Sequence, residues 1–140
     1  MADTAANHRV LKARPSCATA FQATENAVPA ARAYVTAALA AWGLTPLVED
    51  AKLLVSELIT NAVRYSADTV VVRCSVSEDA QFVIEVGDSS PELPKIGTAE
   101  PLDVHGRGLV IVEAVAADWG AYRVDGGKVT WAALDLEKTN

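Results

Sequence analysis

Few features of this sequence point to a secreted or membrane protein. Its two cysteines, Cys17 and Cys74, have a spacing that matches neither a zinc site nor a disulfide framework, so two independent reduced thiols are expected. No apolar run approaches the length of a membrane span, and the N-terminus lacks the apolar core of a signal peptide. We therefore expect a cytoplasmic protein that does not bind a membrane.

Positive charge is also scarce. The chain has 12 Lys and Arg residues against 18 Asp and Glu residues, for a formal net charge of −6. Direct binding to nucleic acid depends on a basic surface that displaces counterions, so no nucleic-acid partner is expected. A bound polyanion would have to be held locally, by a metal ion and backbone donors. Neither His8 nor His105 has neighbours that would complete a metal site.

The length and the apolar content fit one folded domain. Of the 140 residues, 51% are hydrophobic and 21% are charged, which is typical of a globular chain with a single core. Residues 1–14 are small and polar without a helical or strand period, which predicts a mobile N-terminal tail. Residues 15–140 are predicted to form the domain.

Hydrophobic periodicity predicts three helices and five strands. The helices span about residues 28–42, 45–66 and 109–118, and the strands about 17–23, 69–76, 81–86, 121–124 and 129–136. Thr45 and Pro46 are expected to begin the second helix, and Trp119 and Gly120 to close the third. Strands that come as hairpins indicate an α+β fold, a two-layer α/β sandwich with a mainly antiparallel sheet and three helices on one face.

A polar band interrupts the apolar face of the second helix. At about 100° per residue, apolar side chains form one arc, which Leu53 is expected to extend: Leu47, Leu54, Leu58, Ala62 and Tyr65. Glu57 and Asn61 stand one turn apart beside this arc, followed by Arg64, within reach of a shared ligand. Either the band is the solvated edge of a surface helix, or it lines a pocket where a carboxylate and a carboxamide handle a proton and a metal ion.

Two further stretches carry chemistry that is weak evidence when each is taken alone. Asp88 follows a strand and precedes a loop restricted by Pro91; its carboxylate suits an exocyclic amine such as that of adenine, or else caps a turn. Gly106 and Gly108 open the third helix and offer backbone donors to an anion, or else form a flexible loop end. The irregular loop between Asp88 and Gly106 is long enough to suggest a function.

Residues Gly127-Lys128-Val129-Thr130 superficially resemble a phosphate-binding loop. The upstream glycine spacing of such a loop is missing, and the segment lies between two predicted strands. It is interpreted as a hairpin turn.

The combination of motifs is far more specific than any one of them. Glu57-x-x-x-Asn61, then Asp88, then Gly106-x-Gly108 resemble, in this order, the N box and the two glycine boxes of the Bergerat-type ATP-binding fold of gyrase, heat-shock chaperones, mismatch-repair proteins and histidine kinases. Within that superfamily the chain most resembles the small anti-sigma-factor serine/threonine kinases. Their typical stretches are Leu-Leu-Val-Ser-Glu-Leu-x-Thr-Asn-Ala-Val-Arg, Gly-Arg-Gly-Leu and Trp-Gly. The likeness covers about residues 21–136.

The resemblance implies a role for each matching residue. Glu57 would act as general base on the attacking hydroxyl, and Asn61 would coordinate the Mg²⁺ that bridges the ATP phosphates. Asp88 would accept a hydrogen bond from the adenine amine, and Arg64 would add positive charge near the phosphates. Residues 89–105 would be the ATP lid. The second glycine box would close over the phosphates: Gly106, Arg107, Gly108 and Leu109.

The resemblance further implies an ATP- and Mg²⁺-dependent serine/threonine protein kinase. Its partners would be a sigma factor, sequestered by direct binding, and an anti-anti-sigma antagonist that is phosphorylated on serine. A homodimer is also expected from the family. The helical hairpin with a phosphorylatable histidine is missing, so a complete sensor kinase is not expected.

The chain departs from the family pattern next to Asp88. Ser90 and Glu92 stand where glycines are usual. These departures favour an alternative function, a non-catalytic module that binds ATP or no nucleotide and regulates a partner by contact. The joint presence of Glu57 and Asn61 favours the kinase.

Overall fold

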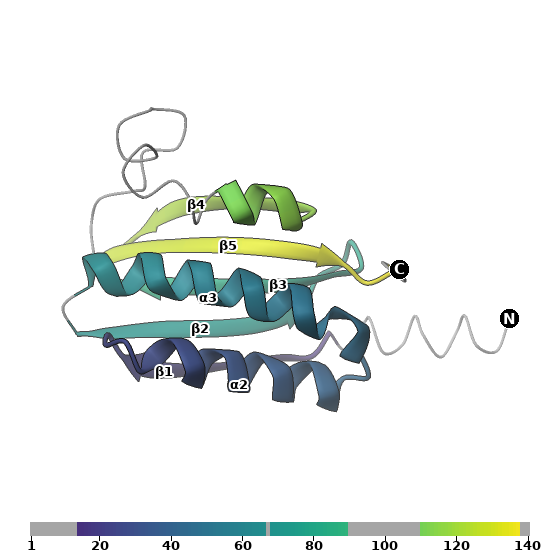
Figure 1. The fold of residues 1–140 in the computed structure, drawn as a ribbon. Helices are drawn as coiled ribbons and strands as arrows, with labels where there is room; N and C mark the ends of the chain where they lie inside the picture. Colours follow the sequence, from purple (N-terminus) through teal and green to yellow (C-terminus); the bar gives the residue numbers. More distant parts are fainter. Residues whose placement is uncertain (1–13, 67, 90–109, 138–140) are drawn as a thin grey trace, which may run out of the picture.

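The protein folds as an α+β sandwich of two layers, with a five-stranded sheet covered by helices on one face (Figure 1). The structure is a computed structural model and describes residues 14–66, 68–89 and 110–137. The strands are β1 (Ser16–Gln22), β2 (Thr69–Val76), β3 (Gln81–Asp88), β4 (Asp118–Val124) and β5 (Gly127–Asp135). The helical elements are α2 (Ala27–Ala41), the 3₁₀ turn η1 (Thr45–Leu47), α3 (Val48–Tyr65) and a short helix at residues 110–115.

The strand order is β1-β2-β3-β5-β4, and every neighbouring pair is antiparallel. Side chains of β2 and β3 alternate between the helix-covered face and the open face, as the period of two predicts. The inward side chains of these two strands are mostly apolar and buried: Val70, Val72, Cys74, Val76, Phe82, Ile84 and Val86. The predicted fold class is confirmed.

Helix α3 buries a wider arc than the sequence predicts. Ala51, Val55 and Ile59 are fully buried besides the expected leucines, because α3 packs on α2 as well as on the sheet. Leu53, expected to extend the apolar arc, is 41% exposed and lies on the flank that carries Glu57. That part of the prediction is wrong.

The third helix ends earlier than predicted. Ala116 N still donates to Val112 O, but Ala117 N already donates to Ala133 O at 2.8 Å, in continuation of the sheet ladder. Trp119 and Gly120, expected to close this helix, therefore lie in β4. At the start of the long helix, Thr45 makes no capping hydrogen bond and begins the 3₁₀ turn instead. No helix in the described ranges is long and apolar enough to cross a membrane.

The two cysteines are free thiols, but they are not independent, contrary to the prediction. Cys17 and Cys74 lie directly opposite each other where β1 pairs with β2. Cys74 is fully buried, and burial, followed by the charge of Cys17 and a hydrogen bond to it, raises the pKa of the Cys74 thiol to about 12. Sequence spacing could not reveal this pairing, because strand register is a tertiary property.

Candidate functional site

The ends of three elements that carry residues singled out in the sequence lie together at one end of the sandwich. β3 ends at Asp88 and β5 starts at Gly127; since the two strands are antiparallel, these ends are neighbours. The C-terminal end of α3 reaches the same place, because Ser66 Oγ lies 3.0 Å from Ser89 Oγ. This end of α3 and the start of β5 lie on the left in Figure 1.

Two hydroxyl groups connect α3 to the residue that follows Asp88. Ser66 Oγ donates to Thr69 O at 3.1 Å. Because a serine hydroxyl has a single proton, Ser89 Oγ is then the donor in its contact with Ser66 Oγ. The end of β3 is thereby held against the end of the helix that carries Asn61.

Glu57, Asn61 and Arg64 form a stripe along one flank of α3. Glu57 and Asn61 are half-buried and Arg64 is exposed. The other flank, which carries Val63, packs against the core. Within the described part of the chain, no ion pair or hydrogen bond joins the side chain of Glu57 or Asn61 to another residue. The stripe is therefore neither a fully solvated edge nor part of the core.

Asp88 is buried and forms an ion pair that the sequence did not suggest. It lies opposite Lys128 in the β3–β5 ladder, and both side chains are 1% exposed. Lys128 Nζ lies 2.7 Å from Asp88 Oδ2. A buried charge is costly unless an opposite charge compensates it, so each of these side chains requires the other.

Gly127 allows the backbone of β5 to approach Asp88 this closely. A methyl group on Gly127 would overlap the carbonyl oxygen of Asp88 and crowd the Cα atom of Ser89. Only a residue without a side chain fits there, and the next residue along β5 is Lys128. The interpretation of residues 127–130 as a hairpin turn is wrong, because these residues are the start of β5 and pair with the end of β3.

One sequence signal could have identified Lys128. In β5 the inward positions follow a period of two, and Thr130, Ala132 and Leu134 are all buried. Lys128 precedes Thr130 by one period and so falls on the same inward face. A lysine at an inward strand position requires a buried acceptor, and Asp88 is the acidic residue at an inward strand end.

Part of the expected site lies outside the described residues. Gly106, Arg107, Gly108 and Leu109 of the second glycine box belong to this part, as do Ser90, Glu92 and the expected lid up to His105. The short helix at residues 110–115 follows the glycine box directly, and Val112 within it is fully buried.

The described residues fit a magnesium ion of the kind that binds together with a nucleotide. They contain no group of three or more His, Cys, Asp or Glu side chains that could hold a metal ion by itself. Mg²⁺ in phosphoryl-transfer sites is usually held by one or two protein oxygens, by phosphates and by water. The carboxamide oxygen of Asn61 can serve as such a ligand, and Glu57 is one turn away.

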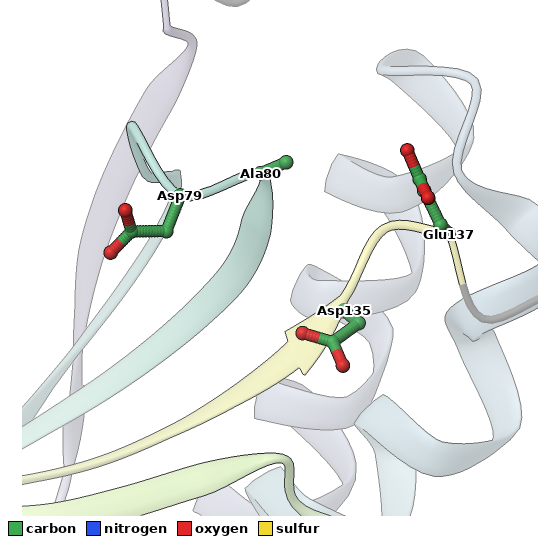
Figure 2. A pocket seen from close by; sticks show the side chains of 4 residues that line it. All are labelled: Asp79, Ala80, Asp135 and Glu137. Carbon is green, nitrogen blue, oxygen red and sulfur yellow. The ribbon is translucent and has the colours of Figure 1, made fainter.

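A separate hollow lies at the opposite end of the sheet, where β3 begins and β5 ends. It is lined by Ala80 and by the carboxylates of Asp79, Asp135 and Glu137 (Figure 2). Gln81 Nε2 donates to Asp135 Oδ1 at 3.0 Å beside it. Three carboxylates repel a polyphosphate, so this hollow does not suit a nucleotide.

Comparison with known proteins agrees with this fold. The sequence pattern of the histidine kinase-like ATPase domain matches residues 21–134, which include α2, α3 and all strands except most of β1 and the last residue of β5. The chain belongs to this family. No curated protein sequence matches it.

Solved structures share the fold of this histidine kinase-like ATPase domain. The RsbU and RsbW domains of Rv1364c from Mycobacterium tuberculosis align with a TM-score of 0.63 and 22% identity, over 86% of this chain and 32% of that chain. The histidine kinase domain of the blue-light activated histidine kinase EL346 from Erythrobacter litoralis aligns with a TM-score of 0.50 and 22% identity, over 68% of this chain and 47% of that chain. The Acinetobacter baumannii histidine kinase AdeS aligns with a TM-score of 0.51 and 12% identity, over 86% of this chain and 68% of that chain.

These identities are low, and the likeness is one of fold alone. The ATPase domain spans about a third of the length of the RsbU–RsbW chain that it matches.

Proposed function

We propose that this protein is an ATP-binding anti-sigma regulator with serine/threonine kinase activity toward an anti-anti-sigma antagonist. The observation that carries the proposal is the match to a histidine kinase-like ATPase domain, in which the helix that carries Glu57 and Asn61 ends beside Ser89, the residue after Asp88. A sigma factor and its antagonist act in the cytoplasm, which is where we expect the protein.

In this proposal each residue of the site has a chemical task. Asp88 accepts a hydrogen bond from the adenine amine, and Asn61 offers its carboxamide oxygen to Mg²⁺. Glu57 takes the proton from the attacking serine hydroxyl. Arg64 and the second glycine box hold the phosphates: Gly106, Arg107, Gly108 and Leu109. The metal ion, when bound, neutralises charge on the phosphates.

The half-buried position of Glu57 supports its task as a base. A carboxylate on the flank of α3 can be reached by a protein substrate, and it stands one turn from Asn61. Phosphoryl transfer depends mainly on positioning and charge neutralisation. Glu57 would position and deprotonate the hydroxyl, and the metal ion on Asn61 would neutralise charge on the phosphates.

The partners are proposed from the type of kinase. One of the similar structures contains RsbU and RsbW domains, which supports a regulatory role of this ATPase domain together with other proteins. We propose that the chain binds a sigma factor directly, phosphorylates its antagonist, and acts as a homodimer.

The experiment begins with a pull-down from the native cell, which identifies the bound partners. Transfer of labelled phosphate from Mg-ATP to the antagonist is then measured for the wild type and for Glu57→Ala. We expect transfer to be lost in Glu57→Ala while Mg-ATP still binds. Glu49→Ala, which removes an exposed carboxylate from the same helix, is the matched control and keeps the wild-type rate. A wild-type rate in Glu57→Ala would reject Glu57 as the base.

The second candidate function is a non-catalytic module that acts by contact. Ser90 and Glu92 in place of glycines favour it, and so does the involvement of Asp88 Oδ2 with Lys128. Calorimetric titration separates the two functions, because a contact module of the nucleotide-free kind binds neither Mg-ATP nor Mg-ADP. Binding of either nucleotide without transfer to any partner would support a module that uses ATP only as a ligand.

A further inference from the structure

The ion pair of Asp88 and Lys128 joins the two strands at the centre of the sheet. β3 and β5 each have a neighbour on both sides, and the pair lies at their adjoining ends on the helix-covered face. Lys128 Nζ and Asp88 Oδ2 are 2.7 Å apart, and neither side chain is more than 1% exposed. The contact is therefore short and shielded from water.

Stability alone does not account for a lysine at this position. Withdrawing two charges from water costs about as much as their attraction returns, and well-packed apolar residues of similar volume are often equally stabilising. The next inward positions of β5 are filled by the uncharged residues Thr130 and Ala132. The charge of Lys128 is explained by the charge of Asp88, and the proposed function needs the charge of Asp88.

Lys128 also determines how the Asp88 carboxylate is oriented. Asp88 is the last residue of β3 and is followed by a bend at Ser89. Two rotatable bonds set the plane of an aspartate carboxylate. A short ion pair between Oδ2 and an ammonium group on the neighbouring strand restricts both.

The backbone around Lys128 is built to keep this contact. Gly127 brings β5 against the backbone of Asp88, and the ladder places Lys128 directly opposite it. On the other side of β5, Arg123 of β4 lies opposite Lys128 but is exposed. Two cations thus lie side by side on adjacent strands, and the buried one, Lys128, forms the short ion pair with Asp88.

We infer that Lys128 is a positioning residue that makes the site selective for a purine with an exocyclic amine. By fixing the plane of the Asp88 carboxylate, it directs an acceptor at the amine hydrogen of adenine. A purine that lacks this amine offers no donor to the carboxylate and loses a hydrogen bond to a charged group. The inference rests on the proposed binding of ATP and names the residue on which recognition of the base depends.

The test compares two nucleotides that differ only in the amine. Mg-ATP and Mg-purine riboside 5′-triphosphate are titrated calorimetrically into the wild type, Lys128→Met and the matched control Arg123→Met. A hydrogen bond to a charged group is worth about 1.5–3 kcal/mol, so the wild type should prefer ATP by about 10-fold to 100-fold. We expect this preference to fall to about threefold or less in Lys128→Met and to stay unchanged in Arg123→Met.

The variants distinguish positioning from a general effect on fold or charge. If Lys128→Met weakens both nucleotides by the same factor, Lys128 acts only through the fold or the charge, and the inference is overturned. If Lys128→Met does not fold, Lys128→Gln takes its place. This variant keeps a weaker donor to the carboxylate, so its preference should be intermediate, and a wild-type preference in it would also overturn the inference.

The wild-type titrations separate this inference from the proposed function. If the wild type binds both nucleotides equally well, ATP binding stands and the role of Lys128 in selecting the amine is rejected. If the wild type binds neither nucleotide, the proposed function and the inference both fail.

Discussion

Asp88 and Lys128 stabilise the protein only as a pair. In Asp88→Asn the ammonium group of Lys128 stays buried without its anionic partner, and we expect the free energy of unfolding to fall by about 3–5 kcal/mol. Guanidinium unfolding measures this loss. The double variant Asp88→Asn/Lys128→Met has neither charge and should recover most of the stability. A single variant as stable as the wild type would show that Lys128 does not depend on Asp88.

Cys74 makes the stability of the protein sensitive to alkaline pH. Its pKa is raised from 9.0 to about 12 in the folded protein, chiefly by burial, so the unfolded chain ionises first as the pH rises. The stability that this thiol contributes is complete below about pH 9 and is lost progressively up to about pH 12. We expect urea midpoints of Cys74→Val to fall less than those of the wild type between about pH 9 and pH 10.5. Equal slopes would contradict the role of this thiol.

The turn between β4 and β5 depends on Gly127. In Gly127→Ala the new methyl group would overlap the Asp88 carbonyl oxygen, so β5 must move away from the end of β3. Forced overpacking of this kind costs about 1–3 kcal/mol. Gly87→Ala is the matched control, because its methyl group would meet its nearest atoms, in Lys128 and Val129, at an ordinary 3.8 Å. Thermal unfolding of the two variants should separate them by several degrees, with Gly127→Ala the less stable.

The buried face and the exposed flank of α3 should lose unequal amounts of stability when a leucine is truncated. Leu58 is 1% exposed in the core, and Leu58→Ala should cost about 2–5 kcal/mol. Leu53, 41% exposed on the flank of Glu57, should lose less than about 1 kcal/mol on the same change. Denaturant unfolding measures both. A large loss in Leu53→Ala would mean that this flank is covered by other parts of the chain, and the stripe would then not be open to a ligand.

β1, the first strand of the sheet, begins close to the first described residue. β1 starts at Ser16, and Pro15 O accepts a hydrogen bond from Val76 N just before it. Removing residues 1–13, where a mobile tail is predicted, should therefore change the thermal midpoint by no more than about one degree. Differential scanning calorimetry checks this. Removing residues 1–22 also deletes β1 and exposes one edge of β2, so a clear loss of stability is expected as the matched comparison.

The elements of the molecule could be predicted from the sequence, but their exact ends and contacts could not. Period-two strands at β2 and β3 and the helical period of α3 are local signals, and the structure confirms them. The end of the third helix was misjudged because Ala117 is already bonded to Ala133, a partner that no local pattern reveals. Likewise, Leu53 looked apolar enough for the core, and only the placement of α2 and the sheet shows which flank is covered.

In the candidate site too, local residue patterns could be identified from the sequence, whereas contacts between distant residues could not. Glu57, Asn61 and Asp88 were identified by residue type and order, and their tasks stay predictions. Lys128 was missed because its significance depends on the β3–β5 register, which places it opposite Asp88. A register shift of one residue would turn Lys128 to the open face of the sheet, so the ion pair is a consequence of the whole strand pairing.

The position of β3 and β5 inside the sheet has a consequence for the motions of the site. Amide hydrogens of a strand bonded on both sides exchange with solvent mainly when the whole domain opens, whereas those at the edges β1 and β4 exchange through local fraying. The strands β3 and β5, which carry Asp88 and Lys128, should therefore belong to the slowest-exchanging part of the protein. Any opening that admits a nucleotide must come from the elements around these two strands, and binding should slow exchange in those elements rather than in β3 and β5.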